Sequence, residues 1–215
     1  MNITQNVFKL ECTKGAYAYA VKDSDGVTLI DTCAPGRGAA ILKELEANGI
    51  KPQDVKRILI THADTDHIGN IGFLTEKCGC DVYISAEDIP YAKGEKKQMG
   101  LRRILALIQK VNLPQLLHTL PDGKIGSIEI IPAPGHTPGH VCFRFENVLF
   151  VGDLVRGRSN VLVDSPNVFM LDKAQNAISM KAISTDGIDW ICMAHGEPVQ
   201  THPAWENYLK GKTKK

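Results

Sequence analysis

Short apolar stretches separated by turn residues make up the start of the chain. NVFKLE, AYAYAV and VTLIDT each have the length and the apolar content of a strand, and DSDG between the last two is a turn sequence. We therefore predict that the chain opens with strands connected by hairpins.

The spacing of apolar residues then changes to that of a helix. Ile41, Leu42 and Leu45 recur three and four positions apart, and the dipeptide at 48–49, Asn-Gly, is a suitable helix end. The apolar run KRILIT follows and predicts a buried strand. Loops that follow such strands lie at the crevice where α/β sheets commonly place their functional sites.

The remaining chain repeats this alternation of strands and helices. DVYISAED predicts a strand, and LRRILALIQKVNL has helical periodicity. Further strands and one further helix are predicted, in chain order, at GSIEIIPAPG, HVCFRF, NVLFVGD, KAQNAISMKAIS (the helix) and DWICMAHG. We predict one domain over residues 1–215, with a helical insertion at about 85–118.

Composition and charge narrow the class of partner. The chain of 215 residues carries 25 Lys and Arg against 24 Asp and Glu, so no net field attracts nucleic acid or an anionic membrane. No apolar run is long enough for a membrane span, and the start lacks the pattern of a signal peptide. The cysteines are scattered along the chain, which is typical of proteins whose thiols stay reduced. We expect a cytoplasmic protein with a small-molecule substrate and no nucleic-acid or membrane partner; the oligomeric state is open.

The segment THADTDH, directly after KRILI, concentrates four side chains that can bind metal. These are His62, Asp64, Asp66 and His67. The alternative interpretation is a helix start, because an Asp can cap a helix and acidic residues favour its N-terminus. Capping would account for one Asp but not for the two histidines.

Three later residues with metal-binding side chains also follow predicted strands. They are His136 in PAPGHTPGH, Asp153 in VLFVGD and His195 in ICMAHG. Two divalent ions held close together need about six protein ligands, including a carboxylate that bridges them. These four regions would supply that set if their loops converged.

The order of these motifs resembles that of the metallo-β-lactamase-fold hydrolases. That superfamily has H-x-H-x-D-H after a strand, then a later His, a bridging Asp and a last His. PGHTPGH and VGD are similar to segments of its glyoxalase II-like and lactonase-like members. The resemblance covers nearly the whole chain. It implies an α/β (α+β) fold, a four-layered αββα sandwich, with the site along one edge of the two sheets.

The resemblance also implies a ligand set for two divalent ions. By this resemblance, the first ion would be bound by His62 and His136, and the second by Asp66, His67 and His195. Asp153 would lie between the two ions. Asp64 departs from the family, which has His at this place. A carboxylate still binds metal but is harder and anionic, so manganese or iron becomes possible beside zinc, which we favour.

The carboxylate of Asp64 also changes the expected charge of the site. Two divalent ions are balanced by three aspartates and a bridging hydroxide, whereas His at position 64 would leave one net positive charge. We therefore expect a weaker Lewis acid, and we expect Asp64→His to raise zinc occupancy relative to manganese or iron.

The predicted function is hydrolysis of a small ester, thioester or lactone through a metal-bridging hydroxide. Asp66 and Asp153 are the predicted catalytic residues, Asp66 as a group that orients the nucleophile. One alternative is an iron-dependent redox enzyme resembling the diiron domain of flavodiiron proteins, which would need a separate flavin partner. Another is a non-catalytic module that binds metal or nucleic acid.

The remaining polar candidates have ordinary interpretations. The basic run YAKGEKKQMGLRR is typical of a solvated helix face, and the apolar residues within and after it, among them Met99 and Leu101, could form a lid or a core. His140 is expected to support its loop or the next strand. His118 and His202 fall outside every motif.

Overall fold

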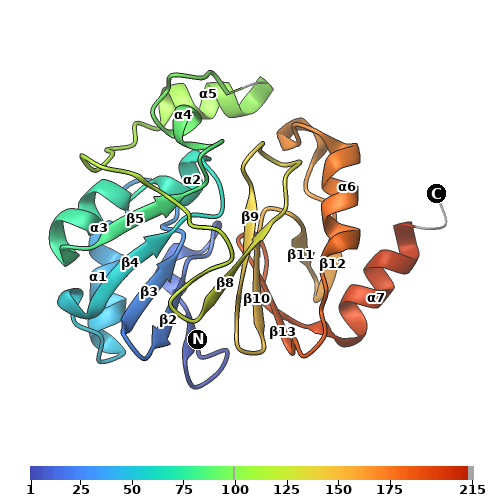
Figure 1. Cartoon of the computed structure of the whole chain (residues 1–215), viewed down its shortest axis with the longest axis horizontal. Coiled ribbons are helices and arrows are strands. Elements are labelled where there is room, and N and C mark those ends of the chain that lie inside the picture. Colours follow the sequence, from blue (N-terminus) through green and yellow to red (C-terminus); the bar gives the residue numbers. More distant parts are fainter. Residues whose placement is uncertain (99, 213–215) are drawn as a thin grey trace.

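Two β-sheets stand face to face in the middle of the molecule (Figure 1). The computed structural model describes residues 1–98 and 100–212. Within these residues each of the two sheets has six strands. The first sheet has the order β1 (Val7–Lys9), β2 (Tyr19–Asp23), β3 (Gly26–Ile30), β4 (Val55–Leu59), β5 (Asp81–Ile84), β6 (His118–Thr119). The second has the order β14 (Val199–Gln200), β13 (Trp190–Met193), β10 (Val148–Gly152), β9 (Val141–Phe145), β8 (Ile128–Pro132), β7 (Lys124–Ile125). A separate ribbon pairs β11 (Arg156–Arg158) with β12 (Val161–Val163).

Helices cover the outer sides of both sheets. The α-helices are α1 (Gly38–Ala47), α2 (Thr65–Ile68), α3 (Ile71–Cys78), α4 (Ile89–Ala92), α5 (Gly100–Ile108), α6 (Lys173–Ala182) and α7 (Thr201–Lys212). Short 3-10 turns are η1 (Glu11–Thr13), η2 (Pro52–Asp54) and η3 (Asn167–Phe169). In Figure 1, α1 and α3 lie outside the first sheet and α6 and α7 outside the second. The predicted four-layered αββα sandwich is confirmed.

The alternation of side chains along the strands builds these layers. Successive residues of a strand point to opposite faces of its sheet. In β3, Leu29 packs in the core under the helices, whereas Ile30 packs between the sheets. Ile58 and Leu59 in β4 divide in the same way. Because both faces are buried at these positions, each of the two strands ends in consecutive apolar residues.

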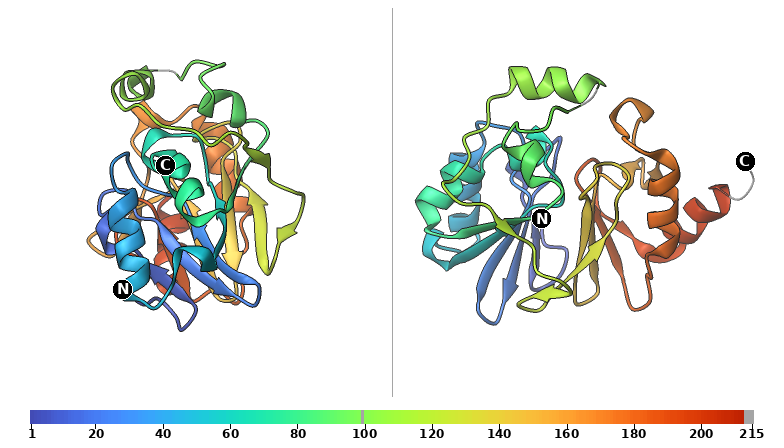
Figure 2. Two further views of the ribbon diagram at one scale, coloured as in Figure 1. Left: turned by 90° about the vertical axis from the view of Figure 1, so that its left-hand side faces the viewer. Right: turned by 45° about the horizontal axis from the view of Figure 1, so that its top comes forward.

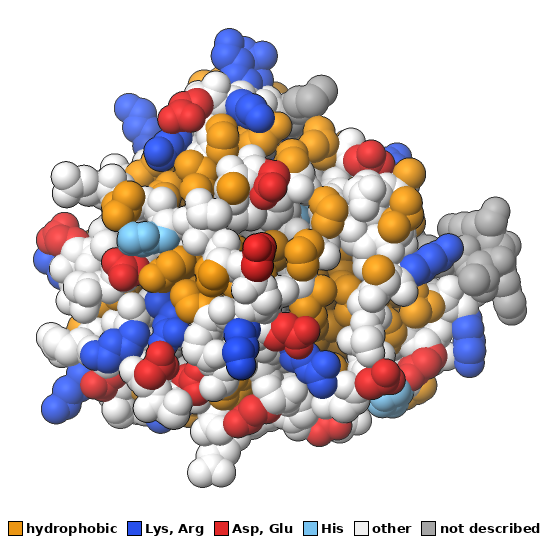
Figure 3. Space-filling model, in the orientation of Figure 1, with side chains coloured by type: hydrophobic (Ala, Val, Ile, Leu, Met, Phe, Trp, Pro, Cys, Tyr) orange, Lys and Arg blue, Asp and Glu red, His pale blue; other side chains and the backbone are white. Residues whose placement is uncertain are grey.

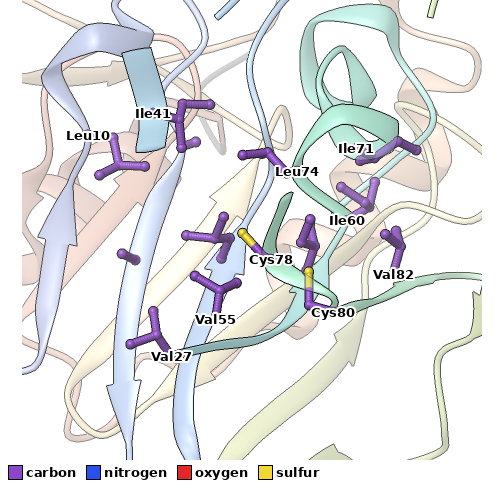
Figure 4. Packing of buried hydrophobic residues seen from close by; sticks show 14 of the residues in the cluster. Leu10, Val27, Ile41, Val55, Ile60, Ile71, Leu74, Cys78, Cys80 and Val82 are labelled. Carbon is purple, nitrogen blue, oxygen red and sulfur yellow. The ribbon is translucent and has the colours of Figure 1, made fainter. Parts of the chain in front are cut away.

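The helix predicted from Ile41, Leu42 and Leu45 is α1. Ile41 and Leu45 are buried against the first sheet, and Leu42 is partly buried beside them. Figure 4 shows Ile41 of α1 and Leu74 of α3 in the layer of apolar side chains that covers this sheet. The helical spacing of apolar residues therefore supplies the outer layer of the fold.

Strand direction brings the ends of several strands to one edge of the sandwich. β8 and β10 both run antiparallel to β9, and β13 runs parallel to β10, so β8, β10 and β13 share one direction. The loops after these three strands consequently leave the second sheet at the same edge. The loop after β4 in the first sheet leads into α2, which lies at the top of the sandwich in Figure 1.

The segment predicted as a helical insertion, residues 85–98 and 100–118 of the described chain and called the insertion below, lies over this edge and is less regular than predicted. It contains α4 and α5, and residues 93–98 and 109–117 have no regular secondary structure (Figure 2). Several large apolar side chains of α5 are exposed, and Figure 3 shows apolar and basic side chains mixed in this upper region. Met99, which was expected to join these apolar side chains in a lid or a core, lies outside the described residues.

No helix in the described parts of the chain is long and apolar enough to cross a membrane.

Candidate metal centre

The seven predicted ligand residues come together at the edge where their strands end. Within three overlapping groups, potential ligand atoms lie within 4.8 Å of one another. The groups are His62, Asp64 and His136; Asp66, His67 and His195; and His62, His67 and Asp153. The first two correspond to the two metal positions that the resemblance implies, with Asp64 joining the first.

Asp153 faces both groups at once. Its Oδ1 lies 3.5 Å from Nε2 of His67 and 3.2 Å from Nε2 of His195. Its Oδ2 lies 3.6 Å from Nε2 of His136. Each oxygen of one carboxylate is thus directed to a different group, which is the arrangement expected of a bridging ligand.

The other two aspartates each belong to one group. Oδ2 of Asp64 lies 3.1 Å from Nε2 of His136 and 3.5 Å from Nε2 of His62. Oδ2 of Asp66 lies 3.4 Å from Nε2 of His195. Each group therefore combines imidazole nitrogens with a carboxylate oxygen, a donor set that divalent transition metals accept.

Several atoms that point into this centre have no other partner. Nε2 of His62, His67 and His195 and Oδ1 of Asp153 are buried, and none has a hydrogen-bond partner among the described residues. Buried polar atoms in proteins are nearly always hydrogen-bonded, so several unpartnered atoms in one place require an explanation. Metal ligation would satisfy all of them, and the residues present fit a pair of divalent ions.

Hydrogen bonds on the far side of the rings orient the histidines. Nδ1 of His67 lies 2.8 Å from Oδ2 of Asp31, and Nδ1 of His195 donates to the carbonyl of Gly15. A ring that donates through Nδ1 keeps its Nε2 lone pair free, which is the tautomer that binds metal through Nε2.

Asp31 was not identified from the sequence. Besides holding His67, its carboxylate accepts hydrogen bonds from the backbone N–H and the hydroxyl of Thr61, both at 2.8 Å. Its backbone is in the left-handed region, with φ at 59°. The sequence signal that could have identified Asp31 is its place directly after the strand VTLI. Because β3 is parallel to β4, the carboxyl ends of these two strands are neighbours.

Asp88 and His140 support the loops that carry ligands. Asp88 accepts hydrogen bonds from the backbone N–H groups of Ala63 at 2.9 Å and Gly139 at 2.8 Å, which joins the two histidine loops. Nε2 of His140 accepts a hydrogen bond from the backbone N–H of Asp153 at 3.2 Å. The side chain of His140 therefore supports the loop after β10, whereas the sequence analysis expected it to support its own loop or the next strand.

The capping interpretation of Asp64 is wrong. Asp64 precedes the first residue of α2, but its side chain caps no backbone N–H of that helix. Its Oδ1 instead accepts hydrogen bonds from Nε of Arg102, at 2.9 Å, and from Nη2 of the same residue. The side chain of Asp64 is thereby turned toward the centre and the insertion.

The interpretation of the basic run as a solvated face is wrong at Arg102. Lys93, Lys96, Lys97 and Arg103 are exposed, whereas Arg102 is buried. The charge balance expected from the ligands alone therefore omitted a cation. Arg102 offsets the charge of Asp64, so Asp64 does not by itself imply a weaker Lewis acid.

Electrostatics keep the carboxylates of the centre ionised. Burial would raise the pKa of Asp153, but His195 and His67 outweigh it and hold this pKa well below its usual value. Burial likewise opposes ionisation of Asp64, but its contact with His136 and the nearby imidazole of His62 lower its pKa well below the ordinary range. Both side chains are anionic at neutral pH, as metal ligands must be.

Two histidines of the centre differ in their preferred charge. Burial, followed by the nearby His67, lowers the pKa of His62 well below its usual value, so its imidazole is neutral. Burial also disfavours protonation of His195, but Asp153 and Asp66 outweigh it and raise its pKa to about 9. A metal ion must therefore displace a proton from His195, which couples metal binding to pH.

A cavity of about 200 Å³ adjoins the centre. Asp64, Asp66, Asp153 and His195 line one side, and Arg102, Leu105 and Ala106 of the insertion line another. Arg156 and Phe169 also line the cavity. The site thus combines metal ligands with a small, partly apolar space that could receive part of a substrate.

Known proteins provide an independent comparison. The family model described as the metallo-beta-lactamase superfamily matches residues 14–195. The probable metallo-hydrolase YybB of Bacillus subtilis (strain 168) is 26% identical over 201 residues, which cover 90% of this chain and 86% of that protein. The hydroxyacylglutathione hydrolase of Psychromonas ingrahamii is 33% identical over 149 residues, covering 69% of this chain but only 50% of the relative.

Solved structures show the same fold. The metallo-beta-lactamase family protein TTHA1429 from Thermus thermophilus superposes with a TM-score of 0.72 at 24% identity, covering 99% of this chain and 81% of that one. TTHA1623, solved in a di-iron-bound form, has a TM-score of 0.69 at 24% identity, covering 86% and 89%. Because the family model spans most of the chain, the protein belongs to the metallo-beta-lactamase superfamily of hydrolases.

Proposed function

We propose that this protein is a dinuclear metal-dependent hydrolase of a small-molecule ester, thioester or lactone. The observation that carries the proposal is the position of Asp153, whose two oxygens face two separate groups of ligand atoms. The buried and unpartnered Nε2 atoms beside it support the same interpretation.

The residues of the chain divide the work between holding metal and orienting reactants. His62, Asp64 and His136 would hold one ion, Asp66, His67 and His195 the other, and Asp153 would contact both. When bound, such ions supply Lewis acidity and lower the pKa of water toward neutrality. The carboxylate of Asp66 lines the cavity, and its side chain is 34% exposed. It can therefore accept a hydrogen bond from the attacking water and orient it.

The size and lining of the cavity favour a small acyl substrate. Leu105, Ala106 and Phe169 provide apolar surface beside the ligands. The hydroxyacylglutathione hydrolases among the relatives favour a thioester, although this chain spans about half of their length. We propose the wider class, because the half of those proteins that is not matched can contribute to their substrate binding.

Metal identity and location complete the proposal. Zinc is favoured by the histidine-rich donor set, and iron or manganese is compatible with the three carboxylates. TTHA1623 is an example of this fold with two irons. The cysteines are free thiols, which agrees with a cytoplasmic location.

The test is reconstitution of metal-free protein with zinc, manganese or iron separately, followed by elemental analysis and hydrolysis assays. We expect two ions per chain and turnover of a lactone or thioester with at least one metal, and little turnover of phosphoesters. His62→Ala should abolish turnover, and His202→Ala, an exposed histidine away from the site, should not. Full activity without bound metal would contradict the proposal.

A further inference from the structure

The insertion reaches the metal centre through one buried cation. Arg102 in α5 is 7% exposed, whereas its helix neighbours Leu101, Arg103 and Ile104 are exposed. Arginine is almost never fully buried unless it is paired. Its burial therefore indicates a specific role rather than a position on a solvated face.

The guanidinium of Arg102 contacts two separate loops of the centre. Nε and Nη2 both donate to Oδ1 of Asp64, and Nη1 donates to the backbone carbonyl of His136 at 2.8 Å. The planar fork of arginine suits a fixed arrangement of this kind, which an ammonium group cannot reproduce. One side chain thus connects α5 with two residues that belong to the same ligand group.

These contacts determine which oxygen of Asp64 remains available. Oδ1 is occupied by Arg102, and Oδ2 is left to face Nε2 of His136 and of His62. A free carboxylate could present either oxygen, or could rotate away from the centre. The hydrogen bonds between Arg102 and Oδ1 therefore fix the orientation of the Asp64 carboxylate, with Oδ2 directed toward the histidines.

The pair of Asp64 and Arg102 also has the net charge of the ligand that is more common at this place. Most members of the superfamily have a neutral His where this chain has Asp64. Asp64 and Arg102 together are also neutral, so their combination presents a single ligand atom with the net charge of a histidine. The negative charge of Asp64 is balanced within hydrogen-bonding distance, at the side of the cavity that α5 forms.

We propose that Arg102 is a positioning residue that makes Asp64 a competent ligand at the first metal position. It does so by orienting Oδ2 and by compensating the carboxylate charge. The proposal rests on the proposed function, because it takes Asp64 as a ligand. A purely structural role, in which Arg102 only fastens the insertion, would leave metal binding intact.

The first experiment compares Arg102→Met, Arg102→Lys and the exposed control Arg103→Met in the full chain. Cobalt is titrated into metal-free protein, and ion stoichiometry and the visible absorption spectrum are recorded. We expect Arg102→Met to weaken binding of one of two cobalt ions about 10- to 100-fold, the cost typical of losing a residue that orients a ligand. Arg102→Lys should recover part of that affinity through its charge, and Arg103→Met should match the wild type.

The second experiment exchanges both residues. In Asp64→His alone, Arg102 would face a neutral ligand without a counter-charge, so binding of one ion should weaken rather than favour zinc. In the double variant Asp64→His/Arg102→Met, two ions should bind again. A normal circular dichroism spectrum for each variant shows that the fold is retained. This test remains informative even if Arg102→Met alone does not fold.

The outcomes separate the two proposals. If wild-type protein does not bind two ions, the proposed function fails. If the wild type binds two and Arg102→Met binds both with unchanged affinity and spectrum, only the role of Arg102 is overturned. The same holds if Asp64→His binds two ions as tightly as the double variant. Increased tryptic cleavage within residues 93–110 without a change in metal binding would show that Arg102 only fastens the insertion.

Discussion

The two-sheet frame and the insertion above it are built in different ways. In the frame, central strands bury both faces, and each ligand loop is held by buried hydrogen bonds such as that between Asp31 and His67. In the insertion, α5 leaves Leu107 and Ile108 72% and 73% exposed. The frame therefore fixes most of the ligands, whereas α5 covers the cavity with few buried apolar contacts.

The attachments of α5 and its flanks beside the ligand loop are polar, whereas apolar residues nearer the ends of the insertion, such as Ile89 and Leu113, pack against the first core. Apart from Arg102, the amide of Gln98 lies 3.3 Å from the carbonyl of Ala63, and the hydroxyl of Thr65 donates to Gln109 at 2.7 Å. Segments with few buried apolar contacts open at low free energy cost. Apart from Arg102 and Asp88, which contact the ligand loops, we therefore expect residues of the insertion to affect substrate selection, and residues of the frame to affect metal binding and folding.

The largest effect is expected from the residue that the two ligand groups share. Asp153→Ala should leave fewer than two ions per chain and lower kcat/KM by at least about 10³-fold, because Lewis-acid stabilisation by metal amounts to several kcal/mol. Elemental analysis and initial rates measure both. Asp122→Ala, at an exposed position, is the control. Two tightly bound ions in Asp153→Ala would contradict a bridging role.

Glycines in the two regions should differ in their tolerance of a side chain. A Cβ at Gly69 would lie 2.4 Å from the backbone carbonyl of Cys33, so Gly69→Ala should lower the free energy of unfolding by about 3 kcal/mol through overpacking. At Gly94 in the insertion, φ is +72° but nothing lies within 4 Å, and Gly94→Ala should cost about 1 kcal/mol. Urea denaturation measures the free energy of unfolding of both variants. Equal losses of stability would contradict a difference between the two regions.

A smaller effect is expected at the carboxylate behind His67. Asp31→Asn keeps an acceptor for Thr61 but removes the negative charge that orients and polarises the imidazole. Metal affinity should fall about 10- to 100-fold, measured by competition with a chelator. The exposed Asp81→Asn should have no effect. If the two variants bind metal equally well, Asp31 serves only to join the loops.

The smallest effect is expected at residues of the insertion that contact no ligand residue, and it should concern substrate only. Leu105 lines the cavity, so Leu105→Ala should change KM about tenfold while the metal content stays at the wild-type value. Leu107→Lys replaces an exposed side chain and should change the free energy of unfolding by less than about 0.5 kcal/mol. Loss of metal from Leu105→Ala would contradict the division of roles between frame and insertion.

The elements of the frame were predictable because their signals are local. The helical spacing of Ile41 and Leu45 and the apolar run KRILIT follow directly from which faces are buried. The insertion was predicted as helical but has regular helices only at α4 and α5. Its amphipathic pattern does not specify a structure on its own, because the apolar face of α5 remains largely exposed.

The sequence by itself determined the candidate ligands and their order, because each lies in the segment that follows a strand and metal ligation restricts the residue types. Only the tertiary structure decided how they are held. Asp31 is 36 residues from His67, and Arg102 is 38 residues from Asp64. An arginine in a basic run and an aspartate after a strand are common in solvated positions. Their roles arise from burial and from pairing with groups distant in the chain, neither of which has a local signal.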